Sequence, residues 1–501
     1  MRERTDSPGL GSGFGSLGSA ALTATSALVV TALSAIAGIV IAREFGRTDE
    51  TDGFFAAYGV FIVVVLASQA IRIAVLPDLA RAREERRLAG EIAGFAIAIA
   101  VVAVPLVLLA ELETDRIAGL LTGDGSEVAQ DSAAEALRWM VPAAAAHLFA
   151  GLFASGLAAL DDYGTAAFGY AAGSAAGLAL ILARVEPDGI IAVAWGMTLN
   201  GTIAVLVPAV GLAVRALRTR MPAAAARPAG IPMRSRLGVF AAAAVLPIAL
   251  QMLYVVCLPF AGRLGTGAVT SFGYAYLAAA GLVTVTAFSL GLVTSVPLTR
   301  AGLGSEQSAH HVVSAAWIAL VLIGAAAGVF ALAGAEVVEA VLGGAYGGGV
   351  GEEVGRLVVV LGAWMVVSVG VNVAFPLLFV VGRLRALPWI GVLALAVQVP
   401  LAWAAGELLE LDGLAISLAL TTLLVLVLLL RELGALRPAV RGLAIAALVV
   451  GALTVASFLP PAVVLAPVAA AVAGLVLYGV LLAITRPRGL AASWRYLRAL
   501  R

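Results

Sequence analysis

The chain has 501 residues, of which 62% are hydrophobic and only 12% are charged, and its mean hydropathy is +1.06. A soluble domain of this length does not need so much apolar surface, whereas a helical bundle surrounded by lipid does. The formal net charge is +1, and all 31 basic residues are arginine. The single cysteine, Cys257, excludes an intramolecular disulfide and a CxxC-type metal site.

Fourteen apolar stretches are long enough to cross a bilayer, for which roughly 20 apolar residues suffice. The predicted spans are 20–42, 53–76, 89–110, 136–159, 164–183, 189–214, 238–261, 267–298, 308–334, 355–381, 387–407, 411–431, 440–459 and 462–484. The first stretch has no signal-peptide cleavage pattern, so it is predicted to be a retained helix. The fold class predicted from the sequence is therefore an all-α membrane protein with about 14 transmembrane helices.

Arginines mark alternate loops between these stretches. The two termini and every second loop hold 23 of the 31 arginines, while the opposite loops, such as 44–52 and 336–353, are acidic or neutral. Lysine and arginine accumulate in cytoplasmic loops of membrane proteins. The sequence therefore predicts a multi-pass protein of the cytoplasmic membrane with both its N-terminus and its C-terminus in the cytoplasm.

A Pro/Ala-rich segment near the middle of the first twelve helices predicts two halves. The expected organisation is a tail (1–19), an N-lobe of helices 1–6 (20–214), a linker (215–237), a C-lobe of helices 7–12 (238–431), helices 13 and 14 (432–485), and a basic cytoplasmic tail (486–501). The second span ends AVLPDLAR and the eighth, six helices later, ends TSVPLTR. This weak repeat favours two pseudo-symmetric lobes, an arrangement common in transporters.

No enzyme motif appears in the chain: HExxH, the P-loop and GxSxG are absent, as is a paired acid and base inside the spans. The sequence therefore predicts a protein that is not an enzyme and that uses no cofactor, no metal and no nucleic-acid partner. The most informative single residue is Arg72, inside the second span, where a cation costs about 2.5–3.5 kcal/mol at the helix centre. It either extends to the headgroups or faces a hydrated cavity and binds an anion, with Gln69 on nearly the same face.

Several other polar residues are candidates for substrate contact. Arg43 and Asp52 flank the first predicted outer loop. They either form a charge pair or belong to an ordinary interfacial loop of mixed charge. Gln251, Asn372 and Gln398 lie inside spans seven, ten and eleven, where polar side chains either join neighbouring helices or contact a substrate or ion. His147 is either a packing residue of span four or a proton carrier.

The segment IVIAREFGRTDETDGFFAAYG (Ile39–Gly59) resembles the signature of MurJ/MviN proteins, in which A-R-x-F-G is followed by an Asp and two Phe. Further segments resemble that family in the same order: AVLPDLARARE, RWMVPAAAAHLFAGLFASGLAALDDYGTAAF, LGTGAVTSFGYAYLA, NVAFPLLFVVGRLRALP and LDGLAISLAL. The resemblance covers nearly the whole chain, and fourteen helices is the number that the family has.

The resemblance implies membership of the multidrug/oligosaccharidyl-lipid/polysaccharide exporter superfamily. It implies two six-helix lobes around a central cavity, two further C-terminal helices that form a lipid-facing groove, and a place in the bacterial inner membrane. It also implies that the substrate is lipid II, an undecaprenyl-diphosphate-linked precursor, which is flipped from the inner to the outer leaflet by alternating access. Its partners would be the lipid-linked substrate, membrane lipids and proteins of cell-wall synthesis.

The chain departs from the family where the family carries charge. The first-helix arginines of relatives correspond to Ala37 and to Thr31 or its neighbours, and Y-A-D-R of the eighth helix corresponds to Tyr274–Leu277. The arginine pair that follows the Asp-Phe-Phe motif in relatives is replaced by Val65 and Leu66, and Pro400 stands at the eleventh-helix asparagine. Arg43 and Asp52 are retained, and Arg72 is the intramembrane cation that could replace the missing ones.

Diphosphates are usually bound by lysine or arginine, so these departures leave several functions open. The chain could flip a lipid II-like or other polyprenyl-linked glycan through Arg72, Arg43, Asp52, Gln69, Gln251 and Asn372. It could move a less anionic amphiphile, or act as a transport-inactive scaffold for envelope assembly. A cation-coupled multidrug antiporter is the further alternative, but it requires an acidic residue deep in a lobe, and the acids of this chain are expected in loops.

Overall fold

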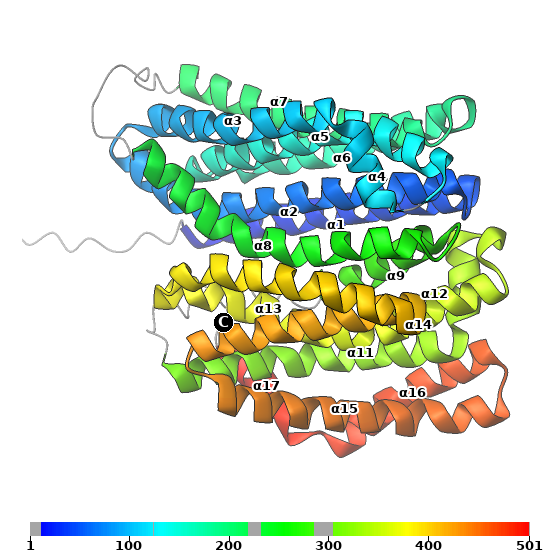
Figure 1. Cartoon of the computed structure of the whole chain (residues 1–501). Helices are drawn as coiled ribbons and strands as arrows, with labels where there is room; N and C mark the ends of the chain where they lie inside the picture. The colour runs from blue at the N-terminus through cyan, green and yellow to red at the C-terminus, as the bar shows by residue number, and fades with distance from the viewer. Residues whose placement is uncertain (1–11, 124, 219–231, 285–303, 500–501) are drawn as a thin grey trace, which may run out of the picture. The chain divides into compact units, whose positions relative to one another are not determined.

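The structure is a computed structural model that describes residues 12–123, 125–218, 232–284 and 304–499. Within these ranges all regular secondary structure is helical (Figure 1). A helix satisfies its backbone N–H and C=O groups internally, which lipid cannot do, and this explains why such apolar segments fold as helices.

Nine α-helices are described in the first part of the chain. They are α1 (Ser12–Phe45), α2 (Asp49–Glu84), α3 (Leu88–Leu112), α4 (Thr114–Thr122), α5 (Glu127–Ala159), α6 (Tyr163–Asp188), α7 (Ile191–Arg218), α8 (Met233–Gly262) and α9 (Ala268–Val283). The predicted outer loop after the third span is thus largely helical, because α4 and the first turns of α5 occupy it. The predicted eighth span continues beyond α9 into 285–303, which lie outside the described residues.

Seven α-helices follow, with short 3-10 turns at Gly344–Tyr346 and Leu384–Ala386. They are α11 (Ser305–Leu342), α12 (Gly349–Val360), α13 (Gly362–Val381), α14 (Leu387–Glu432), α15 (Leu436–Val464), α16 (Pro467–Thr485) and α17 (Arg488–Ala499). The expected basic tail is therefore a helix, α17, over most of its length.

Twelve described helical segments are long and apolar enough to cross a membrane, and α9 is a shorter apolar helix. One of the twelve, α14, has 46 residues, more than twice the length that a bilayer requires. Its backbone turns sharply at Glu410, where φ is +53°, so that the predicted spans 387–407 and 411–431 are both present. The described helices therefore account for the all-α, multi-span prediction, and the chain is a multi-pass membrane protein.

The chain forms two compact units. Unit 1 comprises Met1–Ile41, Val60–Thr114 and Glu135–Ala244, and unit 2 comprises Ala42–Gly59, Asp115–Ala134 and Val245–Arg501. The segment Ala42–Gly59, which joins α1 to α2, thus belongs to the same unit as α9 and α11–α17. The sequence-based division into two six-helix lobes stays a prediction.

Unit 1 packs through apolar side chains and close backbone approaches. Its core contains Val75, Leu79, Phe95 and Leu152 from α2, α3 and α5. Helices α6 and α7 touch through glycines: a Cβ at Gly177 would lie 2.5 Å from the carbonyl oxygen of Gly196. Small residues let membrane helices approach in this way.

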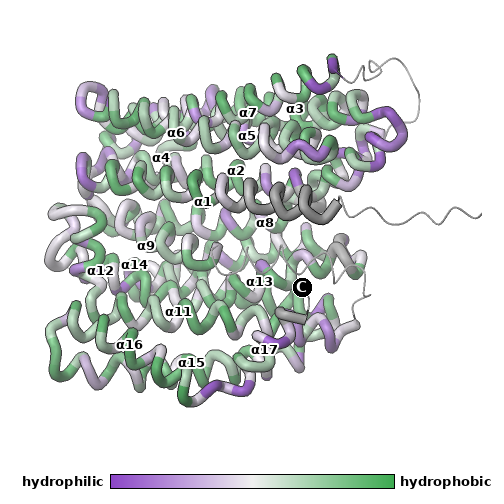
Figure 2. The backbone as a smooth tube through the Cα atoms, turned by 180° about the vertical axis from the view of Figure 1, so that it is seen from behind, coloured by the Kyte–Doolittle hydropathy of each residue, from purple (hydrophilic) through white to green (hydrophobic). Residues whose placement is uncertain are grey.

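Unit 2 has an aromatic core and an apolar outer surface. Tyr254 stacks on Tyr276 with ring centroids 4.0 Å apart, and Trp364 packs against Tyr276 at 5.0 Å. On α15 and α16, large apolar side chains such as Leu448 and Val476 are exposed. Hydrophobic stretches follow the helices and hydrophilic ones gather at their ends (Figure 2), as expected for helices that face lipid.

Candidate functional site

The carboxylate of Asp52 caps the N-terminus of α9 within unit 2. Its oxygens accept hydrogen bonds from the backbone N–H of Gly267 at 2.6 Å, the N–H of Thr270 at 2.8 Å and the Thr270 hydroxyl at 2.5 Å. Asp52 is buried, and it comes from the first turn of α2. A helix N-terminus presents unpaired N–H groups and a partial positive charge, so a carboxylate is favoured there.

Two arginines extend this cluster to the other helix ends of unit 2. Arg43 donates to the carbonyls of Ala340 at 3.0 Å and Val341 at 3.3 Å, at the C-terminus of α11. Arg47 donates to the Gly267 carbonyl at 3.0 Å and lies 3.3 Å from a carboxylate oxygen of Glu353. We call Asp52, Arg43 and Arg47 with these partners the helix-end cluster.

The helix-end cluster differs from the sequence-based expectation. A charge pair between Arg43 and Asp52 was one of the open alternatives, but the structure gives each of the two its own partners on different helices. The Tyr346 hydroxyl, which donates to the Gly46 carbonyl at 3.0 Å, is a further contact that the sequence did not indicate. The cluster fastens the α1–α2 connection to α9, α11 and α12.

Arg72 and Gln69 lie on α2 in unit 1, and both are half-buried. The Ser155 hydroxyl of α5 donates to the Arg72 carbonyl at 3.3 Å, which fixes the backbone there. The Arg72 guanidinium is within electrostatic range of the Tyr170 hydroxyl on α6. Among the residues described in unit 1, no carboxylate forms an ion pair with Arg72.

The two polar candidates of unit 2 each form a hydrogen bond with another residue of the chain. Gln251 accepts a hydrogen bond from the Tyr276 hydroxyl at 2.8 Å, within the aromatic core. Asn372 is exposed, and its side-chain N–H donates to the Ser368 carbonyl of its own helix at 2.8 Å. Of the six candidate residues, Arg72 and Gln69 belong to unit 1, and Arg43, Asp52, Gln251 and Asn372 belong to unit 2.

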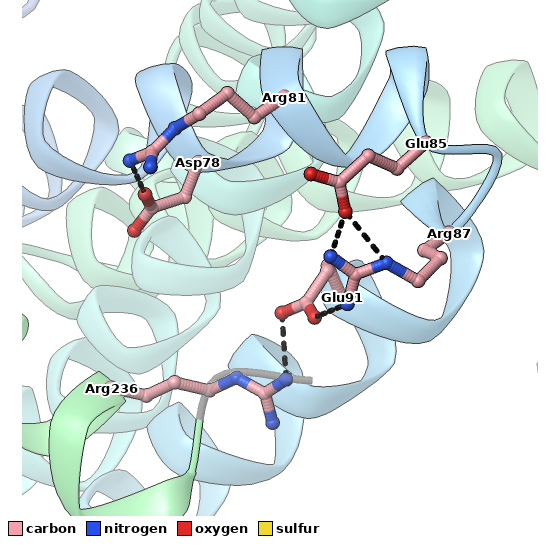
Figure 3. A network of polar contacts seen from close by, with 6 residues as sticks. All are labelled: Asp78, Arg81, Glu85, Arg87, Glu91 and Arg236. Carbon is pink, nitrogen blue, oxygen red and sulfur yellow. Dashed lines mark hydrogen bonds and ion pairs between the residues drawn. The ribbon is translucent and has the colours of Figure 1, made fainter. Parts of the chain in front are cut away.

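A buried ion pair in unit 1 was missed by the sequence analysis (Figure 3). Arg236, at the start of α8, contacts Glu91, at the start of α3, with 2.6 Å between Nη2 and Oε2. Only 11% and 4% of the two side chains are exposed. The Arg236 guanidinium also lies over the Phe95 ring at 5.4 Å, and it covers Gly94, where a Cβ would lie 2.0 Å from Nη1.

Further charged residues surround this pair (Figure 3). Arg87 contacts both Glu85 and Glu91, the latter at 3.5 Å, and Arg81 contacts Asp78. A pocket of about 80 Å³ is lined by Asp78, Arg81, Ala82, Glu85, Arg87 and Glu91. The only sequence signal for this network was Glu91, the one acidic residue inside the third predicted span.

No family model and no curated protein matches the chain by sequence. Solved structures do match. The lipid II flippase MurJ in an inward closed conformation has a TM-score of 0.70 and 13% identity, covering 93% of this chain and 98% of that one.

Two MATE transporters are also similar. An inward-facing MATE family transporter of the MOP superfamily has a TM-score of 0.61 and 14% identity, covering 83% of this chain and 94% of that one. The eukaryotic MATE transporter AtDTX14 has a TM-score of 0.58 and 16% identity, covering 86% and 97%. The chain therefore has the fold shared by the MurJ flippase and the MATE transporters of the MOP superfamily.

Proposed function

We propose that this chain is a flippase that moves a polyprenyl-diphosphate-linked envelope precursor, lipid II-like or another lipid-linked glycan, from the inner to the outer leaflet of the bacterial cytoplasmic membrane. The similarity to the MurJ flippase over 93% of the chain supports a transporter of this kind. The prenyl chain would stay in lipid, while the diphosphate and sugars cross through a hydrated path by alternating access.

The observation that carries this proposal is the state of Arg72. An arginine inside a membrane-spanning helix is costly, and such residues usually pair with a partner or serve a substrate path. Arg72 is half-buried and has no ion-pair partner among the described residues of unit 1. Arginine binds phosphate oxygens through two parallel N–H donors, so Arg72 fits the diphosphate as its anchor.

The remaining candidates have different parts in this proposal. Gln69, one turn from Arg72, would contact the substrate beside the diphosphate. Arg43 and Asp52 are engaged in the helix-end cluster, so they would act by holding that end of unit 2 closed. Gln251 and Asn372 already have partners inside the protein, and substrate contact by either would require these hydrogen bonds to open.

Native mass spectrometry of the purified protein tests the proposal. The protein is offered undecaprenyl-diphosphate lipids with and without sugars, together with ordinary phospholipids. We expect selective retention of the diphosphate lipids, weakened on the order of tenfold to a hundredfold in Arg72→Ala, because a hydrogen-bonded charge contributes about 1.5–3 kcal/mol. Arg72→Lys should recover part of the binding.

Arg184→Ala is the matched control for this experiment. Arg184 is also an arginine of unit 1, but it forms an ion pair with Asp188 on its own helix at 2.5 Å. The Arg184→Ala variant should bind diphosphate lipids as the wild type does. Retention of phospholipids alone by the wild-type protein would overturn the proposal and favour a transport-inactive scaffold or a less anionic substrate.

The cation-coupled antiporter is the second candidate, and Glu91 is the residue that bears on it. Glu91 is a buried acid, but it lies in the first turn of α3 and not deep in a lobe. Both of its oxygens also face arginines, Arg236 at 2.6 Å and Arg87 at 3.5 Å. A carboxylate that is already neutralised by two arginines is poorly suited to bind a coupling cation, so we favour the flippase.

A further inference from the structure

Helix α17 packs on α11 through one face. A Cβ at Gly489 would lie 2.3 Å from the Trp317 ring, so only glycine permits this approach. Ser493, one turn later, is buried. The Tyr496 hydroxyl lies 3.3 Å from Nδ1 of His311. The centroid of the Tyr496 ring lies 4.6 Å from the centroid of the His310 ring. Gly489, Ser493 and Tyr496 are spaced by four and three residues, and they therefore form one face of the helix.

The remaining face of α17 carries exposed basic and aromatic side chains. Arg488, Ala491 and Arg495 are exposed and are spaced by three and four residues, so they lie on a common face. Trp494 lies beside them, and 52% of it is exposed. We call Arg488, Trp494 and Arg495 the basic face of α17.

The C-terminal part of the sequence carries mostly positive charge. From Arg431 to the last residue the sequence has eight arginines and one acidic residue, Glu432. Glu432 itself lies 3.6 Å from Arg383. Arg437 and Arg441, at the start of α15, are exposed. The membrane hairpin of α15 and α16 leads directly into α17 (Figure 1), so the helix begins where a spanning segment ends.

We propose that α17 is a membrane-surface helix whose basic face binds the headgroups of anionic phospholipids. Arginine pairs with phosphate through charge-assisted hydrogen bonds, and tryptophan is enriched at the level of the headgroups. Basic amphipathic helices beside a membrane span bind anionic leaflets in this way. None of its residues belongs to the proposed transport site, and its ligand is a lipid headgroup and not a protein partner.

Lipid bound to the basic face should also affect how α17 docks on α11. Because Gly489, Ser493 and Tyr496 hold α17 against the first turns of α11, lipid bound to the basic face would be held beside α11 as well. Anionic lipid should therefore stabilise the docked position of α17, whereas a zwitterionic lipid such as phosphatidylcholine should do so less.

Native mass spectrometry of the full-length protein in mixed micelles of phosphatidylglycerol and phosphatidylcholine tests this inference. Each arginine near an anionic surface contributes a factor of about five in binding. The double variant Arg488→Gln, Arg495→Gln should therefore retain phosphatidylglycerol on the order of twentyfold less strongly. Arg356→Gln, an exposed arginine of α12 in the same unit, serves as the control and should retain it as the wild type does.

The fluorescence of Trp494 gives a second readout. The difference between the wild-type spectrum and that of Trp494→Phe reports this residue alone. In nanodiscs the difference spectrum should move to shorter wavelength when phosphatidylglycerol replaces phosphatidylcholine. Equal retention of phosphatidylglycerol by the double variant and the control would overturn the inference. A Trp494 emission spectrum that is the same in both lipids would also overturn it, and would favour a protein partner for this face.

Discussion

Asp52 and Gly267 are joined by a short hydrogen bond although 215 residues separate them in the chain. The Asp52 carboxylate accepts from the Gly267 N–H at 2.6 Å, and Gly267 is the N-cap residue of α9 with φ at +82°. Gly267 has no side-chain acceptor that could cap the helix. A carboxylate from α2 therefore supplies the cap that the local sequence of α9 lacks.

Replacing Asp52 should destabilise the protein measurably. Asp52→Ala leaves the N–H groups of Gly267 and Thr270 without their acceptor in a buried place, which costs about 1–3 kcal/mol. Asp52→Asn keeps one oxygen acceptor and should cost less. The melting temperature of the purified protein in detergent checks this order.

Glu50→Ala is the control for the Asp52 variants. Glu50 lies in the same first turn of α2, but its side chain is exposed. It should leave the melting temperature almost unchanged. If Glu50→Ala and Asp52→Ala lowered the melting temperature equally, the cap would not be the source of the effect.

The buried pair of Glu91 and Arg236 makes a second prediction. Glu91→Ala should cost about 3–5 kcal/mol, because it leaves the buried Arg236 guanidinium without its nearest anion. The double variant Glu91→Leu, Arg236→Met should recover much of this loss, since two buried charges are removed together. Denaturant unfolding of Glu91→Leu, of Arg236→Met and of the double variant measures the coupling.

Arg81→Ala is the comparison for that experiment. Arg81 pairs with Asp78 in the same network, but 71% of its side chain is exposed. An exposed pair contributes about 0–1 kcal/mol. A loss in Glu91→Ala no larger than that in Arg81→Ala would show that the buried pair does not stabilise unit 1.

The spans could be predicted from sequence because lipid imposes one simple requirement along the chain. Apolar runs of sufficient length become helices in this environment, and even the double span 387–431 was resolved, because Glu407–Asp412 separates two apolar runs. The sequence did not indicate that the backbone between these two helical segments would turn at Glu410, with φ at +53°.

The candidate site was predicted less completely, since its partners come from distant positions. Nothing local to Asp52 identifies Gly267 and Thr270 as its partners. Glu91 was visible as an acid in an apolar stretch, but its partner Arg236 is 145 residues away and looked like one of several linker arginines. The pairing of side chains from remote helices depends on how the helices pack, and the local pattern of one sequence does not reveal that packing.

A third prediction concerns the role of Arg72 in transport. In proteoliposomes that contain a labelled polyprenyl-diphosphate glycan, Arg72→Ala should fold normally but lose flipping, because its guanidinium is the proposed anchor of the diphosphate. Arg72→Lys should retain partial activity, and Arg184→Ala should be as active as the wild type. Normal flipping by a well-folded Arg72→Ala protein would contradict the role assigned to Arg72.

The last prediction concerns pH and the cap of α6. Asp162 accepts hydrogen bonds from the Thr165 N–H at 3.1 Å and the Thr165 hydroxyl at 2.9 Å, and it pairs with Arg215 at 2.8 Å. Burial alone would raise the pKa of Asp162, but these hydrogen bonds and Arg215 outweigh it and hold the pKa below its ordinary value of 3.8.

A carboxyl whose pKa is lower in the folded state stabilises the protein above its unfolded pKa and loses that contribution as the pH falls through the folded value. The difference in melting temperature between the wild type and Asp162→Ala should therefore be constant from pH 7 to about pH 5 and shrink below about pH 4. Asp161→Asn, at the exposed neighbouring position, is the control. A difference that already shrank between pH 7 and pH 6 would assign the effect to another group, because a lowered carboxyl pKa has no titration there.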